Sequence, residues 1–254
     1  MTDAASPVTA ANGTVDDAEI ARFSAMAAEW WNPHGKFKPL HRFNPVRVGY
    51  LRDRIAGHYG RDPLSPKPLS NLKLLDVGCG GGLLAEPLTR LGAEVTGIDA
   101  SGPGLMAAKL HAEQMGLGID YRETTVEALA ASGAQYDVVL NMEVIEHVAD
   151  RPAFLSASVA ALKPGGLMVV ATLNRSAKAY ALAIVGAEYI LGWLPRGTHD
   201  WKKFVRPDEL RAEMSGAGLT IEETMGVAYN PISDRWSLSR DTGVNYMISG
   251  VKPR

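Results

Sequence analysis

Short apolar runs alternate with segments of helical period through the last two thirds of the chain. The apolar runs predict strands over residues 72–77, 94–98, 119–122, 136–141 and 167–172. The helical spacing predicts helices over residues 83–91, 102–115 and 151–162, and residues 219–229 and 244–251 are expected to form a final hairpin-like pair. This alternation predicts an α/β fold with a mostly parallel seven-stranded sheet and helices on both faces, where ligands bind at the carboxyl ends of the strands.

The N-terminal quarter has a different pattern. Residues 1–14 are small and polar, which predicts a disordered tail and no signal peptide. Residues 15–31 carry apolar side chains at helical spacing after an acidic pair, whereas residues 32–44 are too rich in Pro, Gly and aromatics to predict regular structure. A second helix is expected over 45–59, and three prolines within 62–70 predict a linker. Residues 15–70 are therefore expected to be a helical cap with its linker, and 71–254 the α/β domain.

Glycines at alternate positions follow the first strand of this domain. Gly78, Gly80 and Gly82 allow a tight turn and a close approach of the backbone to a ligand. Seventeen residues after Gly82, Asp99 closes the next apolar run, where a carboxylate can accept hydrogen bonds from ribose hydroxyls. No Gly-Lys-Ser/Thr follows, so a triphosphate P-loop is not indicated. The pattern indicates a nucleoside pocket.

Asp76 distinguishes between two nucleoside ligands. It stands two residues before Gly78, where its carboxylate would repel a pyrophosphate but attract a cationic group. S-adenosylmethionine carries a sulfonium and an ammonium group and no phosphate, so it is favoured over a dinucleotide. The segment resembles the glycine motif of class I S-adenosylmethionine-dependent methyltransferases, which implies their Rossmann-like fold.

Composition narrows the classes of partner. A net charge of −2 argues against a nucleic-acid binder, and 46% hydrophobic residues in 254 suffice for a full α/β core. The single cysteine, Cys79, excludes an intramolecular disulfide and indicates a reducing cytoplasm. Between two glycines, Cys79 is expected to be a small packing residue and not a reactive thiol.

A second polar group follows the strand at 136–141. Glu143 and Glu146 would share one face of a helix and, with His147, suit a divalent metal or a general base. Oxygen ligands favour magnesium, whereas the imidazole also suits zinc or iron. The alternative is that both glutamates cap backbone amides and His147 packs against the loop. Met142 is a candidate for packing on an adenine ring, with core filling as its alternative.

Three further runs sharpen the resemblance. The runs FSAMAAEWWNP (23–33), PLHRFNPVRVGY (39–50) and EVIEHV (143–148) resemble those of the ubiquinone biosynthesis O-methyltransferases, and the similarity extends from about residue 17 to the C-terminus. The resemblance implies donor contacts at Arg47, Gly78, Asp99 and Met142, and magnesium ligands at Glu143, Glu146 and His147.

The resemblance also implies a reaction. The chain would methylate ring hydroxyls of polyprenylated phenols and catechols, early on a 2-polyprenyl-6-hydroxyphenol and finally on 3-demethylubiquinol. Metal-assisted deprotonation is the preferred mechanism, with Glu146 or His147 accepting the proton. One alternative is a class I enzyme that acts on another small phenol or small molecule. The other is a module that binds the donor without turnover.

An apolar stretch over residues 177–194 is too short and too charged for a transmembrane span. Residues 175–206 hold six Lys or Arg against two acidic residues, a local charge of +4 in an acidic protein. Apolar and aromatic residues with basic flanks predict contact with an anionic membrane surface, although a lid or core helix fits the pattern equally. The enzyme is therefore expected in the cytoplasm, peripherally associated with the inner membrane, and the resemblance implies partners in a ubiquinone biosynthesis complex.

Overall fold

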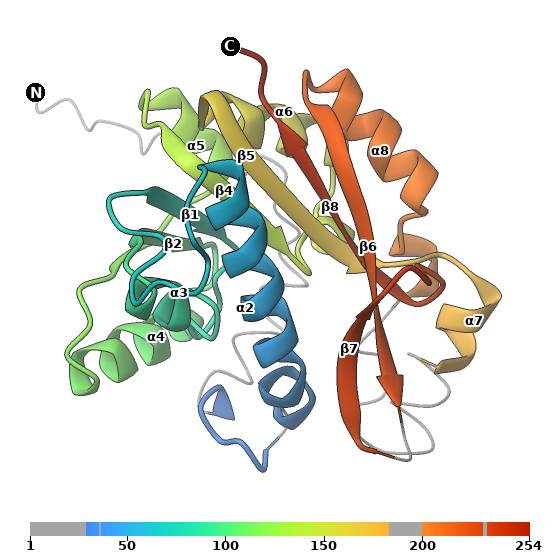
Figure 1. Ribbon diagram of the computed structural model, residues 1–254, viewed down its shortest axis with the longest axis horizontal. Coiled ribbons are helices and arrows are strands. Elements are labelled where there is room, and N and C mark those ends of the chain that lie inside the picture. Colours follow the sequence, from blue (N-terminus) through green and yellow to red (C-terminus); the bar gives the residue numbers. More distant parts are fainter. Residues whose placement is uncertain (1–28, 36, 183–199, 231–232) are drawn as a thin grey trace, which may run out of the picture.

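The computed structural model describes residues 29–35, 37–182, 200–230 and 233–254 (Figure 1). Its strands are β1 Lys73–Val77, β2 Glu94–Asp99, β3 Asp120–Glu123, β4 Tyr136–Met142, β5 Leu162–Leu173, β6 Thr220–Asn230, β7 Arg235–Ser239 and β8 Asn245–Val251. Its helices are α2 Lys38–His58, α3 Ala85–Arg90, α4 Gly102–Gln114, α5 Val126–Ala131, α6 Arg151–Ala160, α7 Ala177–Ala179 and α8 Pro207–Gly216, with short 3₁₀ turns η2 Ile145–His147 and η4 Trp201–Lys203.

The strands form one sheet in the order β3-β2-β1-β4-β5-β8-β6-β7. The five strands β1 to β5 are parallel, and β8 runs antiparallel between β5 and β6. The predicted α/β fold is confirmed, but the described residues form eight strands where seven were expected. The extra strand is β7, an edge strand that pairs with β6 and has no clear alternation of buried and exposed side chains.

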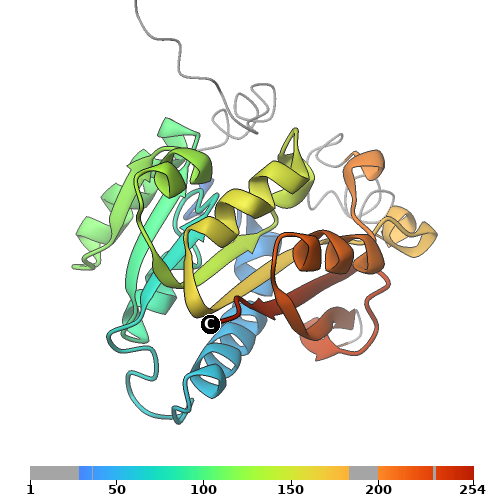
Figure 2. The ribbon, with the colours of Figure 1, turned by 90° about the horizontal axis from the view of Figure 1, so that it is seen from above.

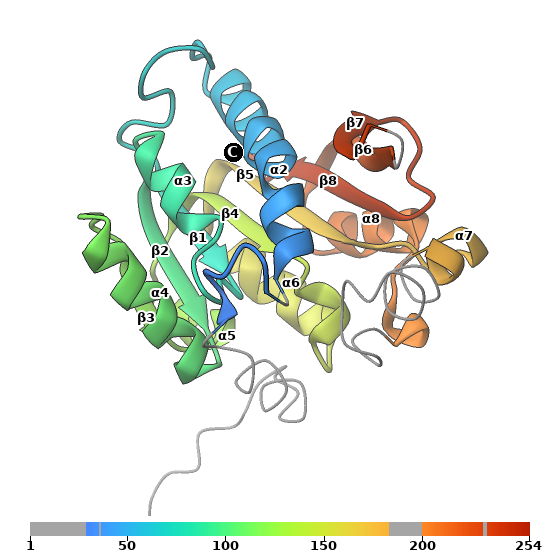
Figure 3. The same ribbon diagram turned by 90° about the horizontal axis from the view of Figure 1, so that it is seen from below.

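Alternate residues of the strands enter two separate cores. Leu74 and Val138 face a core shared with α2, α3 and α4. The next residues, Leu75 and Val139, face a core shared with α5, α6 and α8. Side chains of a strand alternate between faces, so the sheet becomes the middle of three layers. Figure 2 shows the sheet between blue α2 on one side and α6 and α8 on the other, and Figure 3 shows α2, α3 and α4 together.

Helix α2 begins earlier than predicted. The irregular structure expected over 32–44 is wrong for residues 38–44, which belong to the helix. Pro39 lies in the first turn, where no intrahelical donor is lost, and Pro45 lies inside the helix. Burial of Phe43, Tyr50 and Leu51 against the core stabilises this helix in spite of Pro45. The linker over 62–70 contains turns and no helix or strand, as predicted.

Several predictions fall outside the described residues. These are the tail over 1–14, the first helix over 15–31 except its last three residues, and the apolar stretch from residue 183 onward. Of the predicted helix, the three described residues are not α-helical: Glu29 has 3₁₀ geometry, and Trp30 and Trp31 lie in a turn. Among the described helices, none is long and apolar enough to cross a membrane.

Candidate active site

The glycine turn connects β1 to α3 in the predicted way. Gly78, Gly80 and Gly82 have φ values of +68°, +50° and +83°, in the left-handed region that favours glycine. The amides of Gly78 and Cys79 both donate to the Ile98 carbonyl oxygen, at 2.8 and 3.0 Å, and fasten the turn to β2. Burial raises the pKa of the Cys79 thiol, so this cysteine stays a neutral packing residue.

Asp99 lies beside this turn at the end of β2. Its Oδ2 accepts a hydrogen bond from the Gly80 amide, and its Oδ1 accepts one from the Ser101 amide, both at 2.8 Å. Burial raises the pKa of Asp99, and these amides oppose the rise. The turn therefore orients the carboxylate that was predicted to bind ribose hydroxyls.

Arg47 and Asp76 are the next pair that the fold brings to this place. Asp76 of β1 is 2% exposed, and Arg47 of α2 is 3% exposed. Burial raises the pKa of Asp76 to about 7, while the nearby Arg47 charge lowers it and Asp99 raises it. Burial lowers the pKa of Arg47, and Glu143 and Asp76 oppose this effect. One buried cation thus interacts with more than one carboxylate, and this excess of acidic groups favours a cationic ligand.

Glu143 and Glu146 meet at the carboxyl end of β4. Glu143 has a φ of +61°, an unusual value for a residue with a side chain, and it turns the chain from β4 into η2. Burial and the adjacent Glu146 carboxyl raise the pKa of Glu143, and Arg47 opposes them. Glu146 is buried and accepts a hydrogen bond from Thr172 Oγ1 at 2.8 Å. The two carboxyl groups form the candidate acid–base pair.

In the described structure, the three residues expected to bind magnesium are not gathered into one site. Glu143 and Glu146 are adjacent carboxyl groups, and carboxylate oxygens are the ligands that magnesium prefers. Across the described ranges, however, no group of three His, Cys, Asp or Glu side chains is placed to hold a metal ion. The segment forms a 3₁₀ turn and not the α-helix assumed from sequence, so the spacing does not gather His147 with both glutamates.

Met142 and Thr172 lie near the ends of β4 and β5, close in sequence or by hydrogen bond to the two glutamates. Met142 is buried at the end of β4, next to Ala171 of β5 in the register. Its proposed contact with adenine stays a prediction. Thr172 was missed by the sequence analysis because a threonine near the end of a buried strand has no motif of its own.

The tandem tryptophans of the cap were also missed as site residues. An added Cβ at Gly80 would lie 2.6 Å from Trp30 Cη2, and one at Gly81 would lie 2.6 Å from Trp30 Cβ. Trp31 Nε1 donates to the Gly81 carbonyl oxygen at 2.9 Å. In the sequence, the two tryptophans were marked only by their place in the run at residues 23–33 that resembles the ubiquinone biosynthesis O-methyltransferases.

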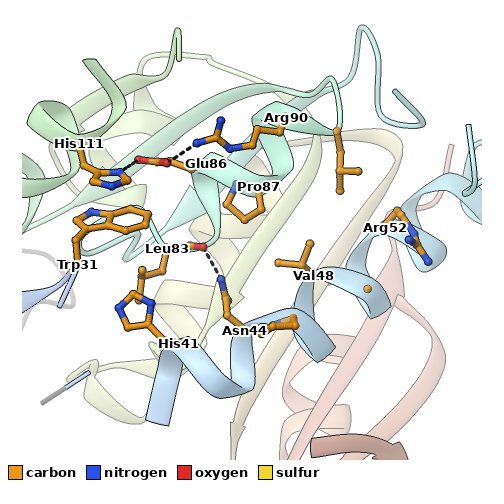
Figure 4. Close-up of a pocket in the computed structure, with 13 residues that line it drawn as sticks. Trp31, His41, Asn44, Val48, Arg52, Leu83, Glu86, Pro87, Arg90 and His111 are labelled. Atoms are coloured by element: carbon orange, nitrogen blue, oxygen red, sulfur yellow. Dashed lines mark hydrogen bonds and ion pairs between the residues drawn. The ribbon is translucent and has the colours of Figure 1, made fainter. Parts of the chain in front are cut away.

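A groove of about 600 Å³ lies between α2 and α3, and Trp31 is one of its lining residues (Figure 4). Pro45, Val48, Leu83 and Pro87 supply apolar walls, and Glu86 forms the polar end with His111. The residues that line it do not include Asp76, Asp99 or the two glutamates, so it is separate from the predicted donor site.

Comparison with known proteins identifies the family. The family described as "Methyltransferase domain" matches residues 50–224. A ubiquinone biosynthesis O-methyltransferase from Parvibaculum lavamentivorans is 60% identical over 96% of this chain and 97% of its own length. Proteins of the same name from Cereibacter sphaeroides and Brucella anthropi are 59% and 58% identical over 96% of this chain, covering 99% and 98% of their own lengths.

Solved structures agree on the fold. A magnesium protoporphyrin IX methyltransferase from Synechocystis, with bound S-adenosylmethionine, has a TM-score of 0.63 at 16% identity over 95% of this chain and all of its own. An S-adenosylmethionine-dependent methyltransferase from Thermotoga maritima has a TM-score of 0.61 at 20% identity, covering 92% of this chain and 99% of its own. With this fold, the donor-type glycine turn and full-length relatives at this identity, the chain belongs to the ubiquinone biosynthesis O-methyltransferases, a class I family that uses S-adenosylmethionine.

Proposed function

We propose that this enzyme methylates ring hydroxyls of polyprenylated phenols and catechols at two steps, early on 2-polyprenyl-6-hydroxyphenol and last on 3-demethylubiquinol. The substrate class follows the name of the full-length relatives. The observation that carries the proposed chemistry is the Glu143–Glu146 pair, which lies beside Arg47 at the carboxyl end of β4.

The pair addresses the main energetic obstacle to this reaction. A phenolic hydroxyl titrates near pH 10, so ionising it at pH 7 costs about 4 kcal/mol. A carboxylate with an ordinary pKa is a poor base for such a proton. The raised pKa of Glu143 reduces the mismatch, because an efficient general base has a pKa near the working pH.

The proposed steps balance without an outside reagent. The carboxylate pair accepts the phenolic proton, and the phenolate oxygen then attacks the methyl carbon in line with the carbon–sulfur bond. That bond breaks, its electrons return to sulfur, and the sulfonium becomes the neutral thioether of S-adenosylhomocysteine. Loss of the sulfonium charge weakens the attraction of Asp76 for the product, which favours product release.

Magnesium is a further part of the proposal. We assign its protein ligands to Glu143 and Glu146, and leave His147 outside this smaller set. When bound, a divalent cation would lower the pKa of the phenolic hydroxyl. A cation would also offset the repulsion between two adjacent buried carboxylates.

The test measures methyl transfer from labelled S-adenosylmethionine to a short-prenyl catechol, with magnesium or with a chelator. We expect E143Q and E146Q to lower kcat with little change in the KM for the donor. The control is E113Q, which alters an exposed glutamate on α4. Full activity of E143Q with chelator would exclude the metal-assisted base. Failure of the wild-type enzyme on prenylated catechols, together with turnover of another small phenol, would favour the alternative substrate class.

We also propose that the surface around α7 and η4 meets an anionic membrane, which retains the prenyl tail. Tyr180, Leu182 and Trp201 are 49%, 54% and 37% exposed there. Aromatic and aliphatic side chains at such exposure suit an interfacial contact.

The charge of this surface is smaller than its sequence indicates. Arg175 pairs with Glu209 and Lys178 pairs with Asp241. Membrane attraction should therefore depend on the exposed apolar side chains more than on the basic residues. We therefore include a peripheral location at the inner membrane in the proposal. Association with a ubiquinone biosynthesis complex is proposed as well, because the prenylated substrate would be shared with other enzymes of that pathway.

Vesicle sedimentation tests the surface. We expect the triple variant Y180S/L182S/W201S to lose binding to vesicles of anionic phospholipid and to keep its activity on a short-prenyl catechol. The control is L110S, which removes an apolar side chain that is 59% exposed on α4. Unchanged vesicle binding of the triple variant would contradict the assignment.

A further inference from the structure

The glycine turn is covered by an aromatic side chain of the cap. The indole of Trp30 lies against Gly80 and Gly81, at contact distances that leave no space for a Cβ at either position. The same indole stacks on Phe37, with ring centroids 4.0 Å apart and planes at 12°. The Gly80 amide holds Asp99, so Trp30 packs on the residue that orients the predicted ribose-binding carboxylate.

Trp31 holds the cap in this position. Its ring stacks on His111 of α4 at 3.5 Å with an interplanar angle of 6°, and its Nε1 donates to the Gly81 carbonyl oxygen. His111 Nδ1 is 2.5 Å from Glu86 Oε1, so α3 and α4 together support the stack. Figure 4 shows Trp31 next to His111, with Glu86 joined to His111 by a dashed line. This bracing fixes the backbone that places Trp30 on the turn.

The indole N–H of Trp30 lacks an acceptor in the part of the chain that the structure describes. Trp30 Nε1 is inaccessible to solvent there and has no hydrogen-bond partner. A buried donor without an acceptor is unfavourable, and a bound ligand commonly supplies the missing partner. S-adenosylmethionine offers oxygens of this kind in its ribose hydroxyls and its carboxylate.

We propose that Trp30 is a donor-binding residue, which packs on the glycine turn beside S-adenosylmethionine and donates its Nε1–H to an oxygen of the donor. This inference rests on the assignment of the turn as the donor site. It adds a contact from the cap, which is separate from the α/β domain in sequence. S-adenosylmethionine and S-adenosylhomocysteine carry the same oxygens, so both should depend on Trp30 to the same extent.

Calorimetric titration of the full-length enzyme with each ligand tests the hydrogen bond. Trp30→Phe should raise both Kd values about tenfold, since one buried hydrogen bond is lost. Trp30→Ala, which also loses the ring, should raise them about a hundredfold. The control is Trp236→Phe, which replaces a partly exposed ring on β7 and should leave both values unchanged.

Stability distinguishes this role from a merely structural one. Among the residues that the structure describes, none accepts a hydrogen bond from this N–H, so Trp30→Phe should not lower the melting temperature without ligand. A purely structural tryptophan would instead lose stability and leave the Kd unchanged. Unaltered Kd values in both Trp30 variants would overturn the proposal.

Gly81 offers an independent test of the position of Trp30. Its φ is outside the left-handed region, so the contact with Trp30 is what opposes an alanine there. Gly81→Ala should weaken donor binding at least tenfold in the wild-type background by displacing the indole. In Trp30→Ala the same change should add less than twofold. Equal losses in both backgrounds would contradict the contact.

The outcomes also separate this inference from the proposed function. If the wild-type enzyme binds both ligands and the Trp30 variants bind equally well, the inference fails and the donor site stands. If the wild-type enzyme binds neither ligand, the assignment of the donor site fails.

Discussion

The protonation state of Asp76 should control the affinity for S-adenosylmethionine. Asp76 is 2% exposed, and no hydrogen-bond donor reaches its Oδ2 in the described structure. Its pKa is raised from 3.8 to about 7, first by burial and then by Asp99, against the opposing effect of Arg47. A cationic donor beside this carboxyl favours its ionised form, so binding releases a proton from any molecule in which Asp76 is protonated.

The structure sets the size of this effect. A return from about 7 to the ordinary value of 3.8 corresponds to a limit of about 4 kcal/mol, at about 1.4 kcal/mol per pH unit. With the free-enzyme pKa at about 7, the Kd at pH 5 should be about eighty times the Kd at pH 7.5. The upper limit of pH 7.5 avoids the titration of the donor's own amino group near pH 8.

The folding stability of the donor-free enzyme should depend on pH in the opposite direction to donor binding. Because the folded-state pKa of Asp76 is raised, its contribution favours folding below pH 3.8 and is lost as the pH rises through about 7. Raising the pH should therefore destabilise the free enzyme at this residue and strengthen donor binding. Asp76→Asn should remove both dependences, with a weak affinity for the donor at every pH.

Calorimetric titration of wild type and Asp76→Asn from pH 5 to pH 7.5 measures the effect, because the other acidic groups of the site are present in both proteins. The informative quantity is thus the difference in pH slope between wild type and Asp76→Asn. S-adenosylhomocysteine lacks the sulfonium charge and should show a smaller slope. Identical slopes for wild type and Asp76→Asn would refute the reasoning.

Three other substitutions test the packing and polar contacts of the site. Thr172→Val removes the hydrogen bond to Glu146, which should lower kcat about thirtyfold in steady-state assays and leave the KM for the donor unchanged. This factor corresponds to about 2 kcal/mol in activation free energy. Thr172→Ser should restore kcat, and failure to do so would contradict the role of the hydroxyl. Tyr121→Phe removes a buried hydroxyl that has no hydrogen-bond partner in the described region, and burial of such a group is unfavourable. Scanning calorimetry should therefore show a rise of about 2–4 °C in Tm. A fall in Tm would indicate that the hydroxyl has a partner. Leu51→Ala shortens a fully buried side chain of α2 and should lower the free energy of unfolding by about 2–5 kcal/mol in denaturant titrations. A loss below about 1 kcal/mol would contradict that burial.

Local sequence signals predicted much of the fold and part of the site. The alternation of strands and helices determined the parallel half of the sheet, because strand and helix periods depend on neighbouring residues. The turn from Gly78 to Gly82 was predictable for the same reason, since a positive φ restricts the residue type locally. Asp99 followed from its position at the end of the next strand.

Local signals were less informative where packing outweighs propensity. The first seven residues of α2 contain Pro39 and end next to Pro45, yet burial of Phe43 against the core keeps them helical. Glu143 takes a positive φ that no propensity indicates, and this turn separates His147 from the predicted three-ligand set.

The sequence by itself determined the class of fold, the nucleoside-binding turn and the family. Only the tertiary structure decided that Arg47 interacts with both Asp76 and Glu143, that Thr172 holds Glu146, and that Trp30 covers the turn at Gly80. These contacts join residues far apart in the chain. Their geometry depends on how α2 and the cap pack against the sheet, and hydrophobic periodicity specifies which face of an element is buried but not which side chain it meets.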